Sequence, residues 1–113
     1  MESILTSIKK LLGIGEDYTH FDEDLIMHIN SVFMVLTQLG VGPKEGFYIE
    51  DADKTWNDYG VEPAQLQSIK SYMYMKVKLL FDPSASSAVM ESMNRLVNEF
   101  EWRLNVAVEP IDS

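Results

Sequence analysis

The residues best suited to hold a metal ion lie between Asp51 and Glu62. Oxygen-bearing side chains stand at positions 1, 3, 5, 7 and 12 of a calcium-hand loop, namely Asp51, Asp53, Thr55, Asn57 and Glu62. The sixth position, where the turn needs glycine, is Trp56, and the eighth is Asp58 instead of an apolar residue. No helix is expected directly before this loop. The sequence therefore predicts no calcium site.

Two histidines lie close to carboxylates: His20 precedes Asp22, and Asp24 and His28 would share one face of a helix. A zinc-type centre needs at least three converging ligands, so capping carboxylates beside surface histidines are the better interpretation. The chain has no cysteine, no glycine-rich phosphate loop and no serine in a nucleophile elbow. We therefore predict no catalytic residue, no metal and no cofactor, and hence a protein that is not an enzyme.

Length and charge narrow the class of protein further. A chain of 113 residues makes one small domain, and 46% hydrophobic residues exclude a disordered one. The net charge of -9 argues against a protein that wraps nucleic acid, although DNA would slide past such a surface without sticking. Residues 1–15 lack the pattern of a signal peptide, and no segment has the apolar length to span a bilayer. These features predict a soluble cytoplasmic protein.

The elements that must position any site are helices. Residues 22–40 carry the strongest helical pattern, with acidic residues in the first turn, a stop at Gly40, and an apolar stripe of Leu25, Ile29, Val32, Leu36 and Leu39. Residues 3–12 predict a short amphipathic helix. A third helix starts at Pro63 and breaks at Asp82-Pro83, and a fourth places Val89, Met93, Leu96, Val97, Phe100 and Leu104 on one face. The sequence predicts an all-α domain of four helices, one short and three longer, over residues 1–105.

The connection between the second and third predicted helices, residues 41–62, is long for a compact domain and rich in aromatic and acidic residues. Such a loop packs either on its own domain or on a partner, and the pattern leaves both open. The candidates for a contact with another subunit or partner are Phe47, Tyr48, Ile49, Trp56 and Tyr59. Residues 106–113 form a tail, either disordered or a docking arm.

Several segments resemble the phage head–tail connector family, also called head-completion or adaptor proteins of long-tailed bacteriophages and prophages. They are IKKLLGI (8–14), DEDLIMHIN (22–30), QLG (38–40), YMYMKVKLLFDPS (72–84) and EWRLNV (101–106). The resemblance implies a structural virion protein at the head–tail junction, made and assembled in the bacterial cytoplasm. It implies a ring of about twelve copies that binds the portal and a stopper or tail-completion protein, while DNA passes through without specific binding. The candidates for docking to the portal are Val106, Val108, Pro110 and Ile111.

A small acidic regulatory module, which mimics DNA or acts like an antirepressor, is the alternative that the composition allows. The two functions differ in how copies associate. A ring closes through two unlike faces of each subunit, whereas a regulator of this size is a monomer or a twofold dimer.

Overall fold

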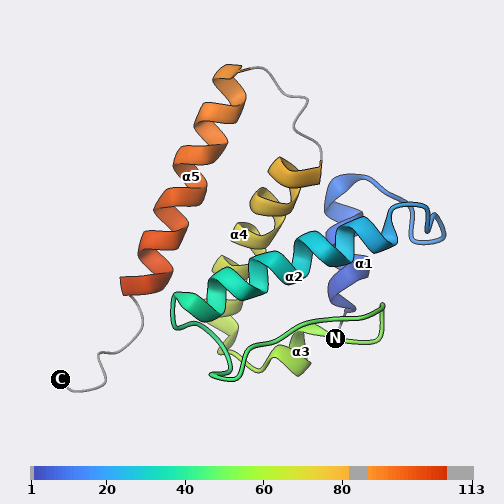
Figure 1. Cartoon of the computed structure of the whole chain (residues 1–113), viewed down its shortest axis with the longest axis horizontal. Coiled ribbons are helices and arrows are strands. Elements are labelled where there is room, and N and C mark those ends of the chain that lie inside the picture. The colour runs from blue at the N-terminus through green and yellow to red at the C-terminus, as the bar shows by residue number, and fades with distance from the viewer. Residues whose placement is uncertain (1, 82–86, 107–113) are drawn as a thin grey trace.

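The computed structural model describes residues 2–81 and 87–106 of the chain (Figure 1). These residues form five helices: α1 (Ile4–Leu12), α2 (Asp22–Gln38), α3 (Trp56–Tyr59), α4 (Pro63–Phe81) and α5 (Ser87–Val106). They contain no strand, and the sole β-type contact among them is an isolated bridge between Ser3 and Thr55. The prediction of an all-α domain with one short and three longer helices is confirmed. The sequence missed α3, a single turn inside the long loop.

Helix α2 forms as its pattern predicts. Asp22, Glu23 and Asp24 occupy its first turn, where carboxylates favour the positive end of the helix dipole. At the other end Gly40 adopts a φ of +86°, a left-handed conformation that costs glycine little. The Val41 amide then donates to the Leu36 carbonyl over 2.9 Å, which satisfies an otherwise unpaired carbonyl and ends the helix.

The core lies where α2 crosses α4, and α1 covers one end of both helices (Figure 1). The fully buried residues of α2 are Leu25, Ile29, Val32, Phe33 and Leu36, and α4 contributes Leu66, Ile69, Tyr72, Met73 and Val77. Pro63 stands at the first position of α4, where its missing N–H has no helical partner to lose. The predicted break at Asp82-Pro83 lies outside the described residues.

Helix α5 packs along α4 and stands at one side of the molecule (Figure 1). Of the six residues predicted to form its apolar face, Val97 and Leu104 are buried, whereas Val89 and Leu96 are exposed. The predicted apolar face is therefore covered only in part. The reason is that α4 is the main helix against which α5 packs, so a single neighbour covers a narrower strip than a full apolar face. Helix α5 runs to Val106, one residue past the predicted end of the domain.

Candidate interaction surfaces

The long loop folds mainly onto its own domain. Of the five predicted contact residues in it, Trp56 is 1% exposed, and Ile49 and Tyr59 are equally buried. Phe47 is half-buried, with its ring centroid 5.0 Å from that of Phe33. Of the five, Tyr48 alone is exposed, at 64%, and so stays available for a partner. Of the two alternatives for this loop, the burial of Ile49, Trp56 and Tyr59 favours packing on its own domain within one subunit.

Trp56 is held by a hydrogen bond to the N-terminal helix. Its indole Nε1–H donates to the Ser7 hydroxyl over 2.9 Å, and that hydroxyl donates to the Ile4 carbonyl over 2.9 Å. The Lys70 ammonium lies 5.6 Å from the centroid of the indole ring, within cation–π range. A buried indole thus has its polar atom satisfied, which explains why Trp56 belongs to the core.

Two acidic residues of the segment that was compared with a calcium-hand loop accept hydrogen bonds from backbone amides. The Asp58 carboxylate accepts from the Thr55 amide over 2.8 Å, and the two residues form a capping box that starts α3. That backbone hydrogen bond lowers the pKa of Asp58. The Asp51 carboxylate accepts from the Asp53 amide over 2.8 Å. Across the described part of the chain, no three histidine or acidic side chains converge to hold a metal ion.

Asn30 fixes the middle of the loop, a role that the sequence analysis missed. Its side-chain amide donates to the Ile49 carbonyl over 2.9 Å, and the Ile49 amide donates back to Asn30 Oδ1 over 2.8 Å. The two bonds mimic a strand pairing and orient Ile49 toward the core. The sequence did contain one indication: the Asn30 carboxamide follows the core residue Ile29 on a strongly apolar helix. A carboxamide that is buried there needs hydrogen-bond partners.

Replacing Asn30 with alanine is expected to release this part of the loop. Two partly buried hydrogen bonds are lost, so the Ile49 amide and carbonyl no longer have partners. This loss is expected to lower the unfolding free energy by about 2 kcal/mol. The measurement is hydrogen exchange at the Ile49 amide together with denaturant unfolding. Asn30→Asp is the matched control, because it keeps the acceptor for the amide and should protect it better than alanine does. Unchanged exchange at Ile49 in Asn30→Ala would contradict this role.

Gly42 and Tyr59 close the loop at its start. Gly42 has a φ of +84°, and a Cβ there would lie 2.6 Å from the Tyr59 hydroxyl oxygen, so no larger residue fits. Within the described residues that hydroxyl has no hydrogen-bond partner, and burial raises the pKa of Tyr59 to about 12. The phenol therefore serves packing, as its contacts with Phe33 and Phe47 at 4.9 and 5.2 Å between ring centroids also indicate.

A buried ion pair joins α1 to α2. The Lys9 side chain is 3% exposed, and its ammonium lies 2.9 Å from Asp22 Oδ1, a side chain that is 26% exposed. The ammonium also donates to the Glu16 carbonyl over 3.0 Å. Asp22 Oδ1 accepts no well-directed hydrogen bond, so the attraction between the two groups is mainly coulombic. This pair orients the short N-terminal helix.

Among the residues that the structure describes, a polar cluster joins α5 to α4, in addition to the buried apolar residues of α5. The Tyr72 hydroxyl donates to Glu101 Oε2 over 2.7 Å, and the Lys76 ammonium lies 3.3 Å from the same oxygen. Burial and the neighbouring carboxylate raise the pKa of Tyr72 far above its ordinary value. The cluster fixes the inner face of α5 and leaves its outer face uncovered.

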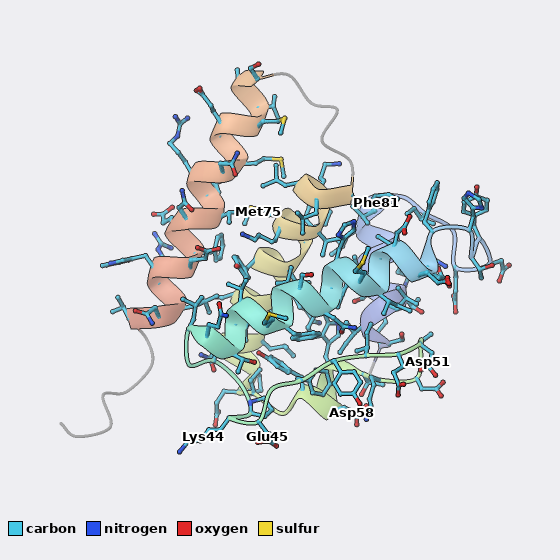
Figure 2. The ribbon with its side chains drawn as sticks, viewed as in Figure 1. Lys44, Glu45, Asp51, Asp58, Met75 and Phe81 are labelled. Atoms are coloured by element: carbon cyan, nitrogen blue, oxygen red, sulfur yellow. The ribbon has the colours of Figure 1, made fainter. Side chains whose placement is uncertain are left out.

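Two exposed surfaces are thus the candidates for contacts with other molecules. One, the α5 stripe, consists of Arg95, Trp102 and Val106, which lie on one face of the helix at spacings of seven and four residues. The other, the loop hollow, has a volume of about 550 Å³ and is lined chiefly by Phe47, Tyr48, Glu50, Asp51, Asp53 and Asp58. Figure 2 places Asp51 and Asp58 on the side of the molecule away from α5. Val108, Pro110 and Ile111, the other predicted docking residues, lie outside the described residues.

Neither histidine belongs to a site. The His20 ring packs edge-on against Phe21 at 4.9 Å between ring centroids, and His28 is half-buried on α2. No helix within the described ranges is long and apolar enough to cross a membrane.

The structure is thus a small helical domain with two exposed surfaces, the α5 stripe and the loop hollow, that are candidates for contact with other molecules. A family model described as phage connector protein matches residues 4–110, which covers all five helices. The chain therefore belongs to the phage connector protein family, and the predicted resemblance is confirmed. Searches of curated proteins and of solved structures found no match. The protein has a structural role at the phage head–tail connection and is a component of the virion, which agrees with the prediction of a protein that is not an enzyme.

Proposed function

We propose that this protein is a subunit of the ring that joins the portal to the stopper or tail-completion protein and extends the DNA channel, in about twelve copies. One observation carries the proposal: the connector family model matches the chain across all five helices, so the relationship rests on the whole fold.

The placement of the exposed surfaces supports a ring. A closed ring of identical subunits needs two unlike faces on each subunit, placed at different sides, so that each copy contacts the next. The α5 stripe and the loop hollow are unlike in chemistry, and helix α5 lies on a different side of the domain from Asp51 and Asp58 of the hollow (Figure 2). The net charge of -9 further suits a channel through which DNA moves, because like charge prevents sticking.

The test uses phage heads that carry a portal but lack this protein. The full chain is expected to bind these heads and form a closed complex of about a dozen copies, measured by native mass on detached complexes. Val106 ends α5, so a chain that lacks residues 107–113 keeps the whole helix. This shortened chain is expected to lose attachment, because we assign the tail to portal docking, while its helical signal stays unchanged.

Two results would contradict the proposal. Full attachment of the shortened chain would exclude residues 107–113 as the docking arm. A discrete twofold dimer that never binds heads, at any protein concentration, would contradict the ring itself.

A further inference from the structure

We propose that the α5 stripe of one copy docks into the loop hollow of the next copy, and that this contact is the lateral bond of the ring. The inference rests on the proposed function and specifies which two surfaces of the chain meet. In this contact Trp102 packs against Tyr48, and Arg95 pairs with carboxylates of the hollow.

The exposure of Trp102 is the first step of the argument. Helix α5 has 20 residues, yet Val97 and Leu104 are the two that its inner face buries. Trp102 is 66% exposed, and Val106 follows one turn later on the same face. A helix gains most of its stability from packing, and tryptophan is among the residues that most often dominate binding energy in interfaces. A second surface that covers the outer face of α5 would account both for the few residues that its inner face buries and for the exposed Trp102.

The charge of Arg95 is the second step. Glu99 is already occupied, because its carboxylate lies 2.9 Å from the Arg103 guanidinium. Arg95 approaches Ser92 at 3.4 Å, and among the described residues no carboxylate pairs with it. With no carboxylate partner within the described ranges, the Arg95 guanidinium is a ready donor for a carboxylate cluster on another molecule.

The loop hollow supplies the complementary chemistry. It carries four carboxylates and one ammonium, from Lys54, and Phe47 and Tyr48 line its aromatic part. Asp51 and Asp58 each accept one backbone hydrogen bond, which leaves further carboxylate lone pairs for a guanidinium. Its volume of about 550 Å³ can admit an indole ring beside a guanidinium.

The positions of the two surfaces indicate that the loop hollow is occupied by the α5 stripe of a second copy. Helix α5 and the tip of the loop lie on different sides of the molecule, whose longest extent is 47 Å (Figure 2). The stripe therefore cannot reach the hollow of its own chain. Two complementary surfaces on different sides of one subunit join head to tail, and repeated contacts of this kind close into a ring.

Charge reversal on either surface tests the contact. Arg95→Glu and Glu50→Arg each place like charges opposite one another, so each variant alone is expected to lose assembly on portal-bearing heads roughly tenfold or more. An equimolar mixture of the two variants is expected to regain assembly, because every contact in an alternating ring is then complementary. Trp102→Ala should weaken assembly by a similar factor without any rescue by mixing.

Lys44→Glu is the matched control, since it makes the same charge change on an exposed residue outside both surfaces and should assemble normally. All four side chains are exposed, so circular dichroism should show unchanged helix content. Normal assembly of both reversed variants, or a mixture that stays inactive, would overturn this interface while the ring of the unmodified chain stands. If the unmodified chain also fails to assemble on heads, the proposed function fails, and the interface with it.

Discussion

Replacing Trp56 with alanine is expected to lower the unfolding free energy by about 3–5 kcal/mol. The indole is 1% exposed, so its removal leaves a cavity beneath α1 and deprives the Ser7 hydroxyl of a donor. A small domain has about 5–15 kcal/mol of stability in total, so much of the population would unfold on mild heating. The measurement is denaturant unfolding followed by circular dichroism.

Two milder variants separate the parts of this effect. Trp56→Phe keeps most of the apolar ring and should cost clearly less than alanine. Ser7→Ala removes the acceptor, leaves the indole N–H buried without a partner, and should cost about 1–3 kcal/mol. A Trp56→Ala protein that keeps its full stability and loses only assembly would instead place this side chain in an interface, contrary to its burial here.

The second large effect is expected at the ion pair between α1 and α2. Asp22→Ala leaves the Lys9 ammonium, 3% exposed, with the Glu16 carbonyl as its remaining partner. An uncompensated buried charge costs about 3–5 kcal/mol, and the first turn of α2 also loses a favourable carboxylate. We expect a loss of about 3 kcal/mol in denaturant unfolding, with α1 the region whose amides exchange fastest.

Lys9→Met is the informative partner variant. It keeps the apolar stem and removes the charge, and the Asp22 side chain, whose Oδ1 is buried, is 26% exposed as a whole, so the carboxylate keeps part of its hydration. The loss should be smaller than that of Asp22→Ala, and the double variant should cost less than Asp22→Ala alone. If Asp22→Ala and Lys9→Met lowered the unfolding free energy equally, the attraction between the two charges would be the main stabilising effect. The cost of leaving the Lys9 ammonium unpaired would then not explain the result.

Local patterns were sufficient to predict α1, α2, α4 and α5, but not the single turn of α3. The apolar stripe of α2 and its stop at Gly40 follow from spacing and backbone preference, which depend on neighbouring residues only. How the loop of residues 41–62 packs cannot be predicted from neighbouring residues. Trp56 and Ser7 are 49 residues apart, and Asn30 and Ile49 are 19 apart, so their pairing depends on the tertiary arrangement.

The candidate surfaces were harder to predict for a related reason. Large apolar side chains on a loop are favoured in a core and in an interface alike, and composition cannot distinguish the two. The structure assigned Trp56 to the core and left Tyr48 exposed. For α5 the pattern showed which face is apolar, but how much of it is covered depends on how many helices surround it. The exposed Trp102 was therefore not foreseen.

The hydrogen bond between Trp56 and Ser7 has a consequence for the order of folding during synthesis. Helix α1 has nine residues, fewer than the 12–15 or so that an isolated helix needs to be even marginally stable in water. Its anchors, the Lys54 carbonyl that accepts from the Ile4 amide and the Trp56 indole, leave the ribosome long after it does. Helix α1 therefore becomes stable only after residues about 50 positions further along the chain have been translated.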